Sequence, residues 1–210
     1  MHHLRGDLLL FGGRFGDAID DYGVALRHYG WRVDPWWSSS ALCCSSVAHL
    51  AMGDTDVARA EAELAMELVG DLPYASGVRG RSITALTAAL AAGGSAADAA
   101  IILVEELAQT ADRPAVEAVV GQPLVSAALA LAPTDPNAAR RLLDLLQRLD
   151  YSRRTPWQHA LCRVVETALP PIESTGFLPP FESVRDAAGA ARGWLADLAG
   201  NDGERLSERS

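Results

Sequence analysis

The sequence repeats one pattern three times: Gly13-Arg-Phe-Gly-Asp-Ala18, Gly53-Asp-Thr-Asp-Val-Ala58 and Gly94-Ser-Ala-Ala-Asp-Ala99. The three glycines lie about 40 residues apart, and an alanine follows each glycine after five residues. Glycine supplies the conformational freedom that a tight turn needs, and alanine lets two helix backbones approach closely. Self-similarity at such a period is typical of helical repeats. We therefore interpret each copy as the turn between two antiparallel helices.

The first two copies extend further than the third. A second alanine follows in them, at Ala25 and Ala65, whereas the third copy has Glu106 at this position. A fourth turn is expected near Pro133, where Pro133-Thr-Asp-Pro136 ends one helix and begins another. Because Ala58 and Ala65 hold the small positions of the clearest repeat, we expect both to be packed tightly between helices.

Signals for helix starts fall where this period places them. Asp34-Pro35, Asp135-Pro136 and Thr155-Pro156 each put a capping side chain before a proline at the first helical position. Near the C-terminus, Trp194, Leu195 and Leu198 belong to an apolar stripe at helical spacing. This stripe makes the last helix a candidate homodimer interface.

Together these signals predict an all-α fold with about ten helices. The expected ranges are 2–12, 16–28, 35–52, 54–69, 75–92, 95–110, 113–131, 135–149, 156–168 and 182–199. They would form a right-handed α-solenoid of about five antiparallel hairpins, a single domain over residues 1–200. The longest irregular stretch inside the fold is expected at 169–180, and residues 201–210 are expected to be a polar, disordered tail.

Composition agrees with this class and excludes others. Hydrophobic residues make up 49% of the chain but aromatic residues only 6%, which suits closely packed helices better than a sheet. The net charge of −9 argues against binding of nucleic acid. The longest apolar stretches, such as 83–92, are shorter than a membrane-spanning helix, and the N-terminus lacks the pattern of a signal peptide. We therefore expect a cytoplasmic protein.

The first hairpin resembles the tetratricopeptide (TPR) consensus of small and aromatic positions across two helices. The matching positions are Leu4, Gly6, Leu9, Gly13, Phe15, Ala18, Tyr22 and Ala25. Residues 35–94 look like the helical solenoid of the large ATP-binding LuxR-type bacterial transcriptional regulators. Features that carry this likeness are Pro35-Trp36-Trp37, Ala48–Asp54, Ala58-Arg59, Ala65, Arg79-Gly80-Arg81, Ala85-Leu86 and Ala91–Gly94.

In that family, such repeats lie between an ATPase module and a DNA-binding helix-turn-helix, and they sense effectors or bind proteins. This chain departs from the family plan, because it has no GxxxxGK[ST] phosphate loop and its last helix is acidic. It is therefore either a fragment of a regulator or a free-standing relative.

Residue types that carry out chemistry are scattered along the chain. Five histidines show no spacing that would place two metal ligands on one helix face: His2, His3, His28, His49 and His159. Cys43 and Cys44 are adjacent and Cys162 stands alone, which gives neither a disulfide framework nor a CxxC metal site. We expect no metal, no cofactor and no catalytic residue, and therefore no enzyme.

Two short motifs have alternative interpretations. Trp36-Trp37 could form an aromatic platform for a ligand, although we favour a wedge between the first and second hairpins. Arg79 and Arg81 could clamp an anionic ligand, although a solvated loop or a helix-helix ion pair is the preferred interpretation.

The TPR resemblance implies that the first helix of each hairpin lines a concave groove. The candidate groove or partner-binding residues are His3, Asp7, Phe11, Trp36, Trp37, Ser40, Cys43, Val47, Arg81 and Thr84. Such a surface suits an extended peptide or an elongated amphipathic ligand. On this hypothesis, Arg81→Ala and Val47→Glu both weaken binding with little effect on the melting temperature. The alternative is that neighbouring helices pack against these residues and no groove exists.

We expect a non-catalytic protein-interaction or effector-sensing module of a bacterial regulator, whose partner is a protein or peptide segment or a small-molecule effector. The alternative is a small-molecule-binding or accessory protein of a biosynthetic or resistance pathway. A deep closed pocket would favour the second function, and an open groove along the first helices would favour the first.

Overall fold

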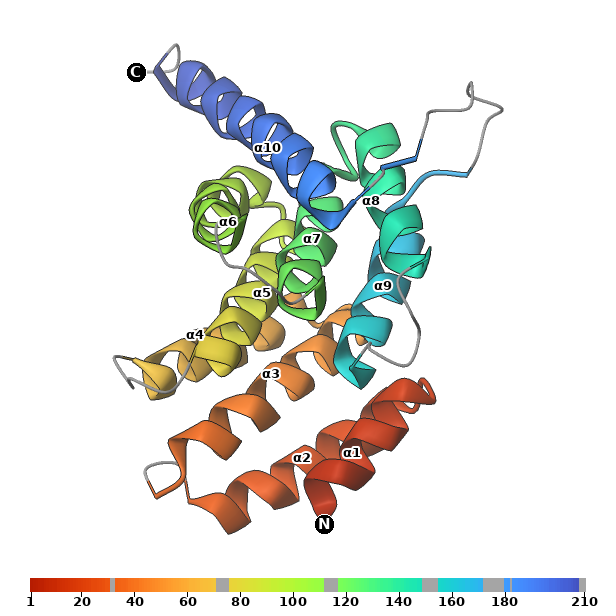
Figure 1. Cartoon of the computed structure of the whole chain (residues 1–210). Helices are drawn as coiled ribbons and strands as arrows, with labels where there is room; N and C mark the ends of the chain where they lie inside the picture. The colour runs from red at the N-terminus through yellow and green to blue at the C-terminus, as the bar shows by residue number, and fades with distance from the viewer. Residues whose placement is uncertain are drawn as a thin grey trace.

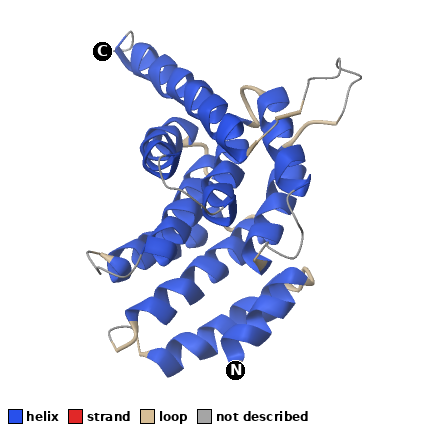
Figure 2. Cartoon of the chain, viewed as in Figure 1, coloured by secondary structure: helices blue, strands red, loops and turns tan. Residues whose placement is uncertain are grey.

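The computed structural model describes residues 1–30, 33–70, 76–111, 117–148, 155–171, 180–181 and 183–207. Within these ranges the chain is helical and contains no strand, which confirms the all-α class (Figure 2). The helices are α1 (His2–Phe11), α2 (Phe15–Tyr29), α3 (Pro35–Met52), α4 (Thr55–Val69), α5 (Ser76–Ala92), α6 (Ala96–Ala111), α7 (Glu117–Leu131), α8 (Pro136–Arg148), α9 (Pro156–Ala168) and α10 (Val184–Ser207). None of these helices is both long and apolar enough to cross a membrane.

Capping side chains begin helices where the sequence predicts them. The carboxylate of Asp34 accepts a hydrogen bond from the Trp37 N–H at 3.2 Å. At the start of α8, Asp135 accepts one from the Ala138 N–H at 2.9 Å. The Thr155 N–H donates to Gln158 Oε1 at 3.0 Å. In each bond a side-chain oxygen accepts from a backbone N–H at the start of a helix, where the helix itself supplies no acceptor.

The three repeat glycines occupy the left-handed region of backbone conformation. Their φ angles are +76° at Gly13, +86° at Gly53 and +88° at Gly94. The backbone hydrogen bonds around them also repeat: the Asp54 N–H donates to the His49 carbonyl, and the Ser95 N–H donates to the Leu90 carbonyl. A side chain at such φ values is strained, so each turn requires glycine.

Alanines and serines allow α3 and α4 to pack closely. Ala58 and Ala65 are fully buried, as predicted. The Ser46 hydroxyl donates to the Ala58 carbonyl at 2.8 Å, and the Ser39 hydroxyl donates to the Ala65 carbonyl at 3.0 Å. The two serines are seven residues apart on α3, and the two alanines are seven residues apart on α4. Both hydrogen bonds therefore lie on one side of this antiparallel helix pair.

From α1 to α8, every helix packs against the next one in the chain. The first helices of successive hairpins also contact one another, α1 with α3, α3 with α5 and α5 with α7 (Figure 1). One large apolar core runs through these contacts and includes residues of α9 and α10. Four consecutive hairpins therefore account for the first eight helices.

The predicted fifth hairpin does not form. Instead of pairing with α10, α9 packs against α1, α3 and α7, while α10 packs against α6, α7 and α8 (Figure 1). The connection between α9 and α10, predicted to be irregular at 169–180, falls largely outside the described residues. Extending the 40-residue period to the end of the chain was wrong, because α9 buries its apolar side against helices distant in sequence.

The last helix is longer than predicted, since α10 continues through Ser207 rather than ending near residue 199. Its apolar stripe is largely used within the chain: Leu195 is fully buried, and Trp194 and Leu198 are half-buried against the core. A homodimer through this helix stays a prediction.

Candidate functional site on the inner face

We use the term inner face for the side of α1, α3 and α7 on which α9 packs, together with Arg81 of α5. Its polar side chains come from three helices that the chain order separates: His3 and Asp7 from α1, Ser40 and Cys44 from α3, and Arg81 from α5. Successive first helices bring them together because those helices contact one another.

A buried polar cluster forms around His3, which is 6% exposed. His3 Nε2 lies 3.9 Å from Asp7 Oδ1, and the Tyr22 hydroxyl donates to the same oxygen at 2.8 Å. Gly6 permits this arrangement, because a Cβ at Gly6 would lie only 2.7 Å from the Tyr22 ring. The cluster thus depends on close packing of α1 on α2.

Burial governs the protonation of this cluster. It lowers the pKa of His3, against the opposing effect of Asp7, so the imidazole is neutral at neutral pH. It raises the pKa of Tyr22 and of both Cys43 and Cys44, so the phenol and the two thiols stay protonated. Protonated thiols are weak nucleophiles.

His3, Asp7 and Cys44 are also the described residues that best match a metal-ligand set. One potential ligand atom from each lies within 4.8 Å of the others. However, Asp7 is already hydrogen-bonded to Tyr22, and the positive charge of Arg81 acts on both His3 and Cys44. The arrangement is therefore better described as a hydrogen-bonded network than as a cation site.

Aromatic side chains enclose the exposed side of His3. Its ring lies 5.6 Å from Tyr22 and 5.6 Å from Trp37, in edge-on geometry, and Trp37 stacks on Tyr29 at 6.2 Å. Trp37 therefore joins α1, α2 and α3, which agrees with the predicted wedge between the first two hairpins. Trp36 is 38% exposed at the same helix start.

Other predicted groove residues lie inside the core. Cys43, Val47 and Thr84 are fully buried, as expected if neighbouring helices pack against them. The Thr84 hydroxyl donates to the Gly80 carbonyl at 2.8 Å. A carboxylate at the position of Val47 would have no access to water, so burial argues against a harmless Val47→Glu substitution. Whether these residues bind a partner stays a prediction.

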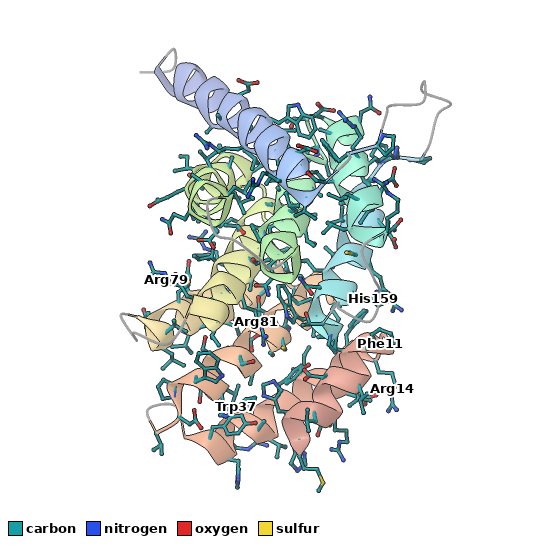
Figure 3. The ribbon with its side chains drawn as sticks, viewed as in Figure 1. Phe11, Arg14, Trp37, Arg79, Arg81 and His159 are labelled. Atoms are coloured by element: carbon teal, nitrogen blue, oxygen red, sulfur yellow. The ribbon has the colours of Figure 1, made fainter. Side chains whose placement is uncertain are left out.

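Arg79 and Arg81 do not act as a joint clamp. Arg79 is exposed, whereas Arg81 extends toward α3 and α9 (Figure 3). Arg81 Nη1 donates to the Ser40 hydroxyl at 2.6 Å, and its guanidinium carbon lies 5.7 Å from the centre of the Trp157 ring. Residues two apart point to different sides of a helix, which explains the separation.

Sequence reasoning missed the contribution of α9 to this site. Its buried residues include Trp157, Leu161 and Val165, spaced so that they share one side of the helix. His159 stacks on Phe11 of α1 at a ring distance of 4.8 Å (Figure 3). The Thr155-Pro156 start and the apolar spacing predicted the helix, but no local signal indicated its partner.

The described residues also line a pocket away from the inner face, with a volume of about 640 Å³. It lies between the α5–α6 turn, the α7–α8 turn and α10. Its lining includes Leu131, Trp194 and Leu198, together with the carboxylates of Asp135 and Asp197. The pocket is of the size that small-molecule sites have, but it does not run along the first helices of the hairpins.

No protein-family model, curated protein or solved structure matches this chain.

Proposed function

We propose that this chain is a helical-repeat interaction module that binds an amphipathic helix along its inner face. The four consecutive hairpins support a TPR-like solenoid, in which the first helices line the concave side. Four repeats exceed the number that such stacks generally need to bury a continuous core.

The observation that carries this proposal is the position of α9. It lies against α1, α3 and α7, and its buried side is apolar except for Gln158, while residues 163 and 166–168 are exposed. An inner face that accepts one amphipathic helix has the shape and the apolar contacts for a similar helix from a partner. In this proposal, α9 is the intramolecular occupant and competes with the partner.

Contacts at the C-terminal end of α1 support the fit of α9. Phe11 stacks on His159. A Cβ at Gly13 would lie 2.9 Å from Arg163 Nη1, so the turn between α1 and α2 approaches α9 closely. Further along α9, Leu161 and Val165 are fully buried and join the core. Apolar side chains at this spacing are the usual anchors of a helix in a groove.

A peptide spanning residues 155–169, labelled with fluorescein, tests the proposal by fluorescence anisotropy. The substitutions Leu161→Ala and Val165→Ala in the full-length chain weaken docking of α9, so the peptide should bind this variant at least ~10-fold more tightly than the parent. Substituting Leu198→Ala in α10 is the matched control, because it loosens a helix that does not cover the inner face. Equal affinity for the parent and the double variant would contradict the proposal.

The resemblance to LuxR-type regulators leads us to propose a regulatory role for this interaction. In such a role, binding of a partner helix would report the presence of that partner to other parts of a regulator. The acidic charge of the chain makes a basic or neutral amphipathic helix the better partner.

A second candidate function, binding of a small molecule, has the pocket beside α10 in its favour. Its described lining carries two carboxylates and no basic residue, and it includes the Trp194 ring, although the guanidinium carbon of Arg141 lies 5.7 Å from the centre of that ring. These features favour a cationic amphipathic ligand. Such a ligand should quench tryptophan fluorescence in the parent and not in Trp194→Phe, and quenching that persists in this variant would remove the pocket from consideration.

A further inference from the structure

We propose that Arg81, Ser40 and Trp157 form a binding site for a small carboxylate between α3, α5 and α9. Because Trp157 belongs to α9, the site exists while α9 is docked, so it does not rest on the proposed binding of a partner helix. Neither the repeat pattern nor the proposed helix binding requires it.

The first observation is the incomplete pairing of Arg81. Its Nη1 donates to Ser40, but its Nε is buried without a hydrogen-bond acceptor. Among the described ion pairs, none joins Arg81 to a carboxylate within 4.0 Å. Arg81 as a whole is half-buried and its guanidinium is always charged, so the cost of burial falls on the Nε–H, which has no acceptor. Arg81 therefore has an unused capacity to bind an anion.

The second observation is a neighbouring donor that is also unpaired. Trp157 is 2% exposed, and its Nε1–H has no hydrogen-bond acceptor. The indole nitrogen can only donate, so water and carboxylate oxygens are its natural partners. The guanidinium carbon of Arg81 lies 5.7 Å from the centre of this ring. Two unsatisfied N–H groups on α5 and α9 are thus neighbours.

His3 adds an unpaired ring nitrogen on the α1 side, which donates or accepts according to the tautomer of the imidazole. It is 6% exposed and its Nδ1 has no hydrogen-bond partner, while the positive charge of Arg81 contributes to lowering its pKa. Unpaired buried polar atoms are rare in folded proteins, and several of them close together indicate a missing group.

The chemistry of these groups selects a carboxylate. A planar carboxylate can accept from the guanidinium and from the indole N–H at the same time. Only one arginine is present, and the carboxylate of Asp7 lies close to His3, so the local field suits a single negative charge better than a doubly charged phosphate. Because Trp157 is enclosed, the anion must be small.

The experiment compares acids with their amides on the full-length chain, by thermal shift and titration calorimetry at constant ionic strength. Acetate and benzoate are the probes, acetamide and benzamide are the neutral isosteres, and inorganic phosphate tests the alternative anion. We expect at least one acid to raise the melting temperature and its amide to have no effect. Arg81→Gln should weaken binding of that acid at least ~10-fold, as expected for the loss of a charge-assisted pair.

Two further variants separate binding from folding. Trp157→Phe keeps an aromatic ring but removes the N–H, so it should weaken binding of the acid. Because the ring is kept, this variant should fold even if Arg81→Gln does not. Arg79→Gln is the matched control, because Arg79 is exposed two residues away. The proposal is overturned if neither acid stabilises the chain, or if an acid and its amide stabilise it equally. It is also overturned if Arg79→Gln weakens binding of the acid as much as Arg81→Gln does, or if phosphate alone stabilises the chain.

Discussion

At the scale of single residues, buried serines determine how closely the helices pack. Ser39 and Ser46 of α3 donate to carbonyls of α4, and Ser126 of α7 donates to the Thr84 carbonyl of α5 at 2.8 Å. A buried hydroxyl needs a partner, and a main-chain carbonyl is reachable only when the neighbouring helix carries a small residue there. The alanine positions of the repeat therefore have a direct physical role.

The first prediction concerns Ala58, whose carbonyl accepts from Ser46 and whose side chain is fully buried. Ala58→Leu should lower the free energy of unfolding by roughly 1–3 kcal/mol, because the added atoms overpack the α3–α4 contact. Chemical denaturation measures this change. Val57→Leu is the control on the adjacent, exposed position. If both variants unfold at the denaturant concentration of the parent, the packing described for Ala58 is wrong.

The second prediction concerns Asp21, a buried carboxylate of α2 that pairs with Arg5 and with His2 Nδ1 at 2.9 Å. The hydrogen bond from Arg5 lowers its pKa from 3.8 to about 2. A lowered pKa in the folded state means that the stabilisation is present above about pH 4 and is lost as the pH falls toward 2.

Asp21→Asn removes this charge, so the difference in unfolding free energy between parent and variant should shrink as the pH is lowered from about 4 to about 2. Urea denaturation at a series of pH values measures the difference. Asp20→Asn, on the neighbouring residue, which is less buried, is the matched control measured over the same pH range. A constant difference for Asp21→Asn across this range would show that the ion pair does not perturb the carboxyl.

The residue scale also shows where sequence reasoning stops. The burial of Ala58 and Ala65 was predictable, because their spacing alone places them at helix contacts. The network of His3, Tyr22 and Cys44 was not predictable, because it joins three helices. The spacing of residues along one helix does not determine how three helices are placed relative to one another.

At the scale of elements, local signals determine the helices and their turns. Except for the end of α10, predicted helix ends within the described residues differ from the observed ones by no more than about two residues, and the start predicted at residue 113 lies outside the described residues. Caps, prolines and turn glycines act over a few neighbouring residues, so they can be recognised from the sequence. The polar composition of residues 201–210 suggested a disordered tail, yet α10 continues through Ser207.

The third prediction contrasts a glycine in a turn, Gly53, with a glycine inside a helix, Gly189. Gly53→Ala should destabilise the chain by roughly 1–2 kcal/mol, because the turn holds φ at +86°. Gly189→Ala, inside α10, should instead stabilise it by up to ~1 kcal/mol. A Cβ at either position meets no atom within 4 Å, so both positions have room for a methyl group. The two positions differ in backbone conformation, which is left-handed at Gly53 and helical at Gly189. Thermal melts with the same sign for both variants would contradict this account of the turn.

At the scale of the whole molecule, α9 decides what the inner face can do. Its side chains reach residues far earlier in the chain, as the contacts of His159 with Phe11 and of Trp157 with Arg81 illustrate. A repeat predicts contacts between successive hairpins only. The return of α9 to α1 and α3 therefore could not be predicted from the period, and it changes an expected open groove into an occupied face.

The most direct test of this account is amide hydrogen exchange, measured on the full-length Leu161→Ala, Val165→Ala variant with and without the peptide of residues 155–169. We expect the double substitution to speed exchange in α9. Saturating peptide should slow exchange in α1, α3 and α7 and leave α6 and α10 unchanged. Peptide protection confined to α6 and α10, or no protection on the inner helices, would contradict the claim that the inner face binds an amphipathic helix.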